Sequence, residues 1–130
     1  MLNNLDVEGS LVFFYYNDLE TASYFYGETL GFELMLDREW VKIYRFSEGC
    51  HVGLVNGERG SHKPNPIKSV RLQVIVSDAE AWFKHLKDIG VQIDREEVHE
   101  GEELHIKAFA FKDPEGYTIE ICEYTTPYGK

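Results

Sequence analysis

The sequence has few cysteines, few basic residues and no long apolar run, and each shortage excludes a class of protein. Its two cysteines, Cys50 and Cys122, are too few for a disulfide framework and belong to no Cys-x-x-Cys motif. We therefore expect buried thiols and a reducing cytoplasm. No segment reaches the roughly 20 apolar residues that cross a bilayer, and the N-terminus lacks the basic start and apolar core of a secretory signal. The sequence thus predicts a cytoplasmic protein with no membrane partner.

The shortage of basic residues argues against a nucleic-acid partner. The chain has 13 Lys and Arg against 23 Asp and Glu, which gives a formal net charge of −10 at pH 7. Binding to a phosphate backbone requires basic side chains, so we expect no nucleic acid to bind. An acidic surface either keeps the protein soluble or attracts a cationic ligand, and the charge alone leaves both readings open.

What the sequence does contain is an internal repeat. Each half opens with an apolar strand-like run, continues with an Asp that caps an amphipathic helix ending in Gly, and closes with further strand-like runs. A repeat of this size defines the architecture before any single motif does. The predicted elements are 11–16, 18–31, 32–37, 40–46 and 50–55 in the first copy, then 70–76, 78–90, 91–93, 105–111 and 117–124 in the second.

The two copies span about 9–56 and 69–124, and a polar linker rich in Gly and Pro, residues 57–68, joins them. With 130 residues and a hydrophobic content of 43%, we expect residues 1–130 to form a single domain. The order of elements is βαβββ twice, which is an α+β fold. One helix can cover only one face of each sheet. We therefore expect two modules that form a curved mixed sheet around a groove.

Particular residues in both copies match a known superfamily. They are Asp18-Leu19-Glu20, Phe25-Tyr26 and Leu30-Gly31-Phe32 in the first copy, and Lys112-Asp113-Pro114-Glu115-Gly116 with Ile119-Glu120 in the second. Together with the βαβββ repeat, they resemble the glyoxalase, bleomycin resistance protein and dioxygenase (vicinal oxygen chelate) superfamily over nearly the whole chain. The resemblance implies the glyoxalase/bleomycin resistance fold. It says little about chemistry, because the superfamily hosts many activities.

The metal-dependent members of this superfamily use four inward-pointing ligands, and this sequence departs from that pattern. The corresponding positions are Leu11, Gly53, Arg71 and Glu120. Only Glu120 could bind a metal, and one carboxylate does not hold a divalent ion tightly. The resemblance therefore implies no metal, no cofactor and no catalytic residue, which argues against an enzyme. Arg71 either pairs with Glu120 or recognises an anionic group of a ligand.

Two histidines leave an alternative open. His51 is two residues from Gly53 and could lie near Glu120, and His105 lies on a predicted strand of the second copy. A displaced metal site made of Glu120 with His51 or His105 would support a metal-dependent lyase, dioxygenase or thiol transferase.

Within the superfamily, the nearest local match is the bleomycin resistance protein, a dimer that sequesters its drug without catalysis. Trp40 takes the place of the aromatic residue that stacks on the flat part of the drug. Lys107 and Phe109 match a cation and a Phe of a later strand, and His105 takes the place of a second stacking Trp. The resemblance implies ligand contacts at these residues and a homodimer. Alternatively, Trp40 is an ordinary aromatic at a strand start.

Strand alternation adds further candidates for ligand contact. Phe13 and Tyr15 alternate with Leu11, and Gln73 alternates with Arg71. These side chains either line the groove or pack between the modules.

We therefore expect a non-catalytic protein that binds a small molecule. It would sequester a flat aromatic or cationic, antibiotic-like ligand in a dimer groove. Besides the metal-dependent enzyme, a third hypothesis is a dimeric module that works through protein contacts alone.

Overall fold

The protein is described by a computed structural model that covers residues 5–130. The chain divides into two compact units, with the boundary between Pro64 and Asn65. We call residues 5–64 the N-terminal unit and residues 65–130 the C-terminal unit, and each is described by itself. No helix among the described residues is long and apolar enough to span a membrane.

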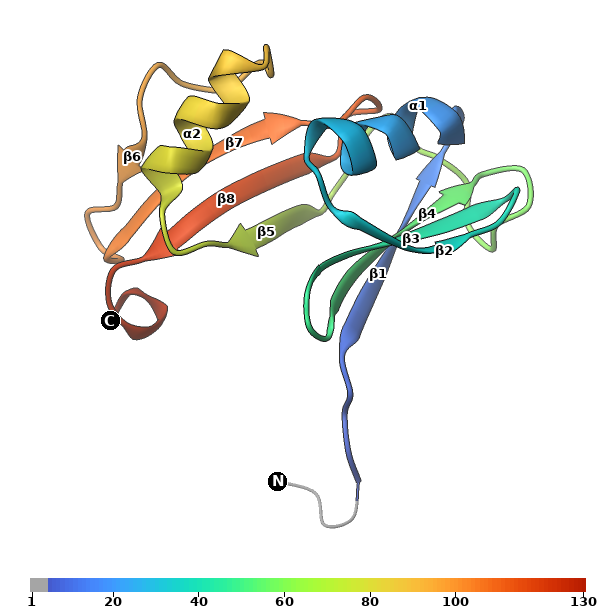
Figure 1. Cartoon of the computed structure of the whole chain (residues 1–130), viewed down its shortest axis with the longest axis horizontal. Coiled ribbons are helices and arrows are strands. Elements are labelled where there is room, and N and C mark those ends of the chain that lie inside the picture. The colour runs from blue at the N-terminus through green and yellow to red at the C-terminus, as the bar shows by residue number, and fades with distance from the viewer. Residues whose placement is uncertain (1–4) are drawn as a thin grey trace. The chain divides into compact units, whose positions relative to one another are not determined.

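The N-terminal unit is built on a four-stranded mixed sheet in the order β1-β4-β3-β2. Strand β1 runs parallel to β4, whereas the other two pairings are antiparallel. The strands are β1 (Ser10–Tyr16), β2 (Glu33–Asp37), β3 (Val41–Ser47) and β4 (Cys50–Asn56). The strands predicted for the first copy are therefore confirmed, and Figure 1 shows the helical segment between β1 and β2.

The predicted helix of the first copy is confirmed in position but not in type. It consists of α1 (Leu19–Tyr24) followed by a π-helical segment, η1 (Phe25–Thr29). Asp18 caps the N-terminus because its carboxylate accepts a hydrogen bond from the backbone N–H of Thr21, at 3.1 Å. Gly31, with a φ of 78°, follows the helical segment in the left-handed conformation that a glycine adopts without steric cost.

The core of this unit lies between the helical segment and one face of the sheet. Phe14 and Tyr16 of β1 are buried there, and Tyr16 donates a hydrogen bond from its hydroxyl to that of Tyr26, at 3.3 Å. Tyr44 of β3 stacks on Tyr26 with 6.4 Å between ring centroids. Since side chains alternate along a strand, Phe13 and Tyr15 point to the opposite face.

The C-terminal unit repeats this topology, with a sheet in the order β5-β8-β7-β6. Strand β5 is parallel to β8, and the remaining pairings are antiparallel. The elements are β5 (Arg71–Ile75), α2 (Ala79–Asp88), β6 (His99–Glu100), β7 (Ile106–Lys112), β8 (Thr118–Tyr124) and a 3-10 turn, η2 (Pro127–Gly129). Asp78 caps α2 through the backbone N–H of Ala81, in the way that Asp18 caps α1. Both units are thus βαβββ modules, and the predicted α+β fold is confirmed.

One strand of the second copy was placed wrongly. The predicted strand at 91–93 is reduced to a single bridge between Ile93 and Phe111, and β6 comes from the segment predicted as a charged loop. The reason lies at Asp94. Its backbone N–H donates to the carbonyl of Ala110, and its carboxylate accepts from the N–H of Ala110, at 3.0 Å. A side chain therefore occupies the next position of the ladder, and the pairing stops there.

Candidate ligand-binding site

The strand register of the N-terminal unit decides which residues share the face away from α1, which we call the opposite face. Phe13 pairs with Gly53, which in turn pairs with Ile43. Tyr15 pairs with Val55, which in turn pairs with Val41. Directly paired residues point to the same side of a sheet. Phe13 and Tyr15 therefore stand on the opposite face with small and aliphatic neighbours.

A hollow of about 440 Å³ lies on this opposite face, and we call it the aromatic pocket. Its lining consists of three aromatic residues, four aliphatic residues and three residues of the segment after β4: Phe13, Tyr15, Trp40, Leu36, Val41, Ile43, Val55, Arg59, Gly60 and Ser61. The structure thus brings together three of the predicted ligand contacts, Phe13, Tyr15 and Trp40. The lining contains no carboxylate, no thiol and no histidine.

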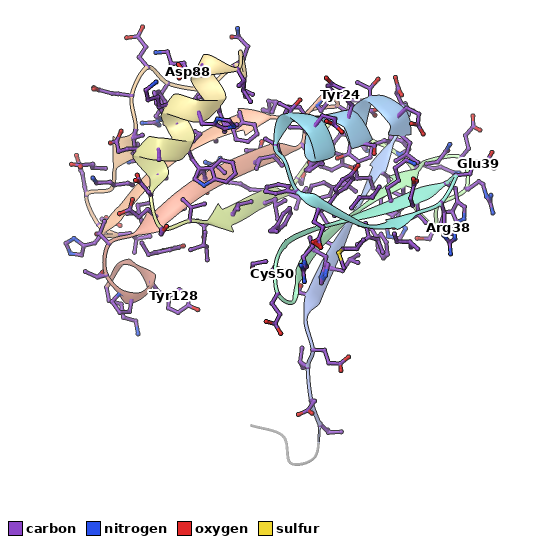
Figure 2. The ribbon with its side chains drawn as sticks, viewed as in Figure 1. Tyr24, Arg38, Glu39, Cys50, Asp88 and Tyr128 are labelled. Carbon is purple, nitrogen blue, oxygen red and sulfur yellow. The ribbon has the colours of Figure 1, made fainter. Side chains whose placement is uncertain are left out.

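Trp40 lies immediately before β3, where backbone hydrogen bonds hold the turn after β2. The N–H of Asn56 donates to the carbonyl of Trp40 at 2.8 Å, and the N–H of Arg38 donates to that of Val41 at 2.9 Å. The guanidinium carbon of Arg59 lies 5.2 Å from the centroid of the Trp40 ring, a cation–π distance. Figure 2 shows the neighbouring Arg38 and Glu39 at the β2–β3 end of the sheet, and neither lines the pocket.

The segment that follows β4 forms one wall of the pocket, which the sequence had not predicted. The N–H groups of Arg59 and Gly60 both donate to the carbonyl of Asn56, at 3.1 and 2.9 Å. Gly60 approaches the sheet so closely that a Cβ there would lie 2.7 Å from Val55 and 2.9 Å from the Tyr15 ring. The first part of the predicted linker is therefore an ordered part of the site, and a glycine permits its approach.

One polar contact and one ring contact hold Tyr15 against this wall. The hydroxyls of Tyr15 and Ser61 lie 3.2 Å apart, within hydrogen-bonding distance. The His62 ring stacks on the Tyr15 ring with 5.2 Å between centroids. No feature of the sequence singles out Ser61 or His62, because the close approach of Gly60 that places them is a product of the fold.

The residues at the superfamily's metal positions do not fit a metal ion. A Cβ at Gly53 would lie 2.5 Å from Cδ1 of Phe13, so the Phe13 ring covers that position. Leu11 supplies no donor, and Arg71 supplies a cation. Among residues 5–130, no group of three or more His, Cys, Asp and Glu side chains is arranged to hold a metal ion.

On the sheet face away from α2, polar side chains of the C-terminal unit form an ion pair and a hydrogen bond with one another. Nε of Arg71 donates to the Glu120 carboxylate at 2.8 Å, so the first of the two alternatives for Arg71 is confirmed. The Tyr124 hydroxyl donates to the side-chain oxygen of Gln73 at 2.7 Å. Burial raises the pKa of the Cys122 thiol on this face, and the nearby Glu120 adds to the effect. The thiol therefore stays protonated and is a poor nucleophile.

Two predicted ligand contacts lie on the wrong face of this sheet. Phe109 is only 2% exposed and packs edge-on against Phe83 of α2, with 5.2 Å between centroids. Lys107 pairs with Glu123, whose carboxylate accepts a hydrogen bond from the first residue of α2. Both side chains belong to the helix-bearing face. Gln73 and Glu120, which share a register position with Ala110, belong to the other.

The displaced metal site with His105 is also wrong. His105 precedes β7, whereas Glu120 pairs with Ala110, five residues further along that strand. At about 3.3 Å per residue this separation is roughly 16 Å, far beyond a shared metal ion. By strand alternation, His105 also points to the face of Lys107. His51, in the N-terminal unit, pairs with Leu11 and Arg45 and does not line the aromatic pocket.

A second, larger hollow differs from the aromatic pocket in its chemistry. It occupies about 730 Å³ in the C-terminal unit and is lined by segment 95–100 and Glu80. Its lining includes four glutamates and no aromatic ring apart from His99. It offers no flat apolar wall on which a ring could stack.

Comparison with known sequences shows the family. The profile of the Glyoxalase/Bleomycin resistance protein/Dioxygenase superfamily matches residues 10–121, and the chain belongs to this superfamily. The resemblance recognised from the sequence is therefore confirmed. A search of curated protein sequences finds no match.

Solved structures of the superfamily share the fold at low sequence identity. A glyoxalase/bleomycin resistance protein/dioxygenase from Nocardioides is 14% identical with a TM-score of 0.75, covering 100% of this chain and 91% of its own. TnmS3, an antibiotic binding protein from Streptomyces sp. CB03234, is 23% identical with a TM-score of 0.74, covering 96% and 100%. A lactoylglutathione lyase from Agrobacterium tumefaciens is 15% identical with a TM-score of 0.73, covering 87% and 90%. The same fold is therefore found in a binding protein and in an enzyme, so the function of this chain has to be argued from the residues of its site.

Proposed function

We propose that this protein binds and sequesters a flat aromatic small molecule in the aromatic pocket without converting it. The observation that carries the proposal is the lining of that pocket. Three aromatic and four aliphatic side chains surround it, and the lining lacks any carboxylate, thiol, imidazole or set of metal donors. Such a lining can desolvate and orient a ring. The imidazole of His62 lies outside this lining with its Nδ1 3.2 Å from the Ser61 hydroxyl, and no ion pair among residues 5–130 orients it as a triad would require.

The size and shape of the pocket suit this role. Its volume of about 440 Å³ falls in the range of pockets that hold drug-sized ligands, roughly 300–1,000 Å³. Trp40 offers an indole face at one side and Phe13 a half-exposed ring at another. Aromatic stacking contributes about 0.5–1.5 kcal/mol per ring pair beyond the burial of area.

The antibiotic-like character of the ligand is part of the proposal. It is supported by the likeness of the fold to TnmS3, which is an antibiotic binding protein. We further infer a cytoplasmic homodimer whose groove includes the aromatic pocket. Light scattering coupled to size exclusion tests the dimer, and a monomeric mass in micromolar solution would contradict it.

A titration with analysis of the recovered ligand tests the proposal. Calorimetry with bleomycin and a series of flat aromatic drugs should identify at least one saturable ligand of the wild type, bound at least about tenfold more weakly by Trp40→Ala. Mass spectrometry of the ligand after prolonged incubation should show it unchanged. Conversion of the ligand, or a full equivalent of transition metal in protein purified without chelator, would contradict a purely sequestering role.

A further inference from the structure

The aromatic pocket contains one charged group, and that group is a cation. Of the lining residues only Arg59 carries a charge, and no Asp or Glu lies among them. This is unexpected in a chain with a net charge of −10, in which acids outnumber bases by 23 to 13. The local charge of the pocket is therefore opposite in sign to that of the whole protein.

Arg59 takes part in no ion pair among the described residues, whereas three other arginines do. Arg45 is paired with Glu33 at 3.0 Å and Arg71 with Glu120 at 2.8 Å. None of the ion pairs among residues 5–130 involves Arg59, whose side-chain contact is the Trp40 ring. A guanidinium that rests on an indole keeps its N–H donors for another acceptor, because cation–π contact uses the face of the cation rather than its edge.

The loop backbone holds this cation at the pocket. The N–H of Arg59 is bonded to Asn56, and the neighbouring Gly60 contacts the sheet. Because Arg59 and Trp40 both line the pocket, a flat ligand held there lies within reach of the guanidinium. A carboxylate, phenolate or sulfonate on that ligand can accept two parallel N–H bonds from a guanidinium, whereas an ammonium group meets a like charge.

From this arrangement, and resting on the proposed function, we infer that the pocket selects flat aromatic ligands that carry an anionic group, and that Arg59 determines this selectivity. The negative net charge of the whole protein does not prevent an anionic ligand from binding next to Arg59. Charges separated by more than about 8 Å are largely screened at physiological ionic strength, whereas Arg59 would lie in contact with the ligand.

Three probes that share one ring system test the inference. Anthracene-9-carboxylate, 9-methylanthracene and 9-(aminomethyl)anthracene carry at one ring position a small substituent that is anionic, neutral or cationic at pH 7. At pH 7 the wild type should bind the carboxylate about tenfold more tightly than the ammonium probe. Arg59→Gln should bring the two dissociation constants together, and Arg59→Glu should reverse the preference.

Arg38→Gln is the matched control, because it removes the same charge two residues from Trp40 at a position outside the pocket lining. It should retain the preference of the wild type. A wild type without preference, a preference for the ammonium probe, or a carboxylate preference that survives in Arg59→Gln would overturn the inference while leaving the binding pocket intact. Failure of all three probes to bind the wild type would overturn both the inference and the proposed function.

Discussion

The two units share one topology but use the sheet face away from the helix in different ways. In the C-terminal unit, polar side chains on that face satisfy one another, Arg71 with Glu120 and Tyr124 with Gln73. In the N-terminal unit, the same face carries the aromatic pocket and Arg59, a cation that forms no ion pair with any carboxylate of residues 5–130. The polar groups of the C-terminal face thus pair with one another, whereas the N-terminal face leaves an apolar surface and a hydrogen-bond donor available to a ligand.

In a repeated fold, function can change most readily on the sheet faces that the helices leave uncovered. On the helix-bearing faces the two units follow the same rule, with buried aromatic and aliphatic residues such as Tyr16 and Phe109 packed under a capped helix. Packing constrains those positions strongly. The opposite faces are less constrained by packing, so one copy can form a pocket while the other forms ion pairs.

The largest expected effect separates a core ring from a pocket ring. Phe109→Ala should lower the free energy of unfolding by about 3–5 kcal/mol, because it leaves a cavity under α2. Phe13→Ala is the comparison, since its side chain is 46% exposed and less burial is lost. Urea denaturation followed by circular dichroism measures both. Equal losses of unfolding free energy in the two variants would mean that Phe13 is a core residue, which would contradict a ligand-binding role for its ring.

A smaller effect separates the two tryptophans. Trp40→Ala should weaken ligand binding at least about tenfold, equivalent to ~1.4 kcal/mol, while Trp82→Ala on α2 should leave the affinity unchanged. Calorimetric titration measures the affinities, and urea denaturation of both variants checks that each is folded at the working temperature. If Trp82→Ala weakened binding as much as Trp40→Ala, the assignment of the site to the N-terminal unit would be wrong.

Breaking the polar pairing of the C-terminal unit should matter less. In the pair of Arg71 and Glu120, the arginine side chain is 56% exposed and the glutamate 12%, so water screens much of the interaction. Glu120→Gln should therefore cost no more than about 1 kcal/mol of stability. It should not change affinity for the ligand of the aromatic pocket. A clear loss of affinity in this variant would show that the C-terminal unit contributes to the site.

The smallest effect concerns the two helix caps. The carboxylate of Asp18 accepts hydrogen bonds from the hydroxyl and from the backbone N–H of Thr21. Both bonds lower the pKa of Asp18 below 3.8, and the bond from the hydroxyl has the larger effect. A pKa lower in the folded than in the unfolded state stabilises the fold above pH 3.8, and this contribution is lost as the pH falls through the folded value. Asp78, the other cap, has Ala81 in place of that threonine.

Thr21→Val removes the hydrogen bond from the Thr21 hydroxyl to Asp18, which has the larger effect on the carboxyl. The variant should therefore raise the pKa of Asp18 toward 3.8. Titration of the Asp18 carboxyl by NMR measures the shift. An unchanged pKa would mean that the hydroxyl does not stabilise the charged form.

The sequence predicted the fold well because its signals are local. The repeated order of apolar runs, the capping Asp18 and Asp78, and the terminal Gly31 each depend on neighbouring residues only. The superfamily's ligand positions, carried onto this sequence, also put Arg71 and Glu120 on one face of the predicted sheet. In the structure Arg71 pairs with Thr118 and Gln73 with Glu120, so the ion pair runs diagonally between neighbouring strands. The fold and the ion pair could thus be predicted without a structure.

The errors arose where a side chain's direction depends on the strand register. Residues 108–111 are all buried, so apolar alternation along β7 does not reveal which side chains face α2. The pairing of Ala110 with Glu120 decides it, and places Phe109 in the core. Arg59 was missed for another reason. Its position depends on the contact of Gly60 with Val55 and Tyr15, and nothing in a polar linker predicts that contact.

The location of the binding site is tested by titrating two single-tryptophan variants with the same flat anionic ligand, anthracene-9-carboxylate. Trp82→Phe retains Trp40 as its only tryptophan, and Trp40→Phe retains only Trp82. If the ligand binds at the aromatic pocket, the tryptophan emission of Trp82→Phe should be quenched saturably and that of Trp40→Phe should change little. Equal quenching in both variants, or saturable quenching confined to Trp40→Phe, would contradict a binding site at the aromatic pocket.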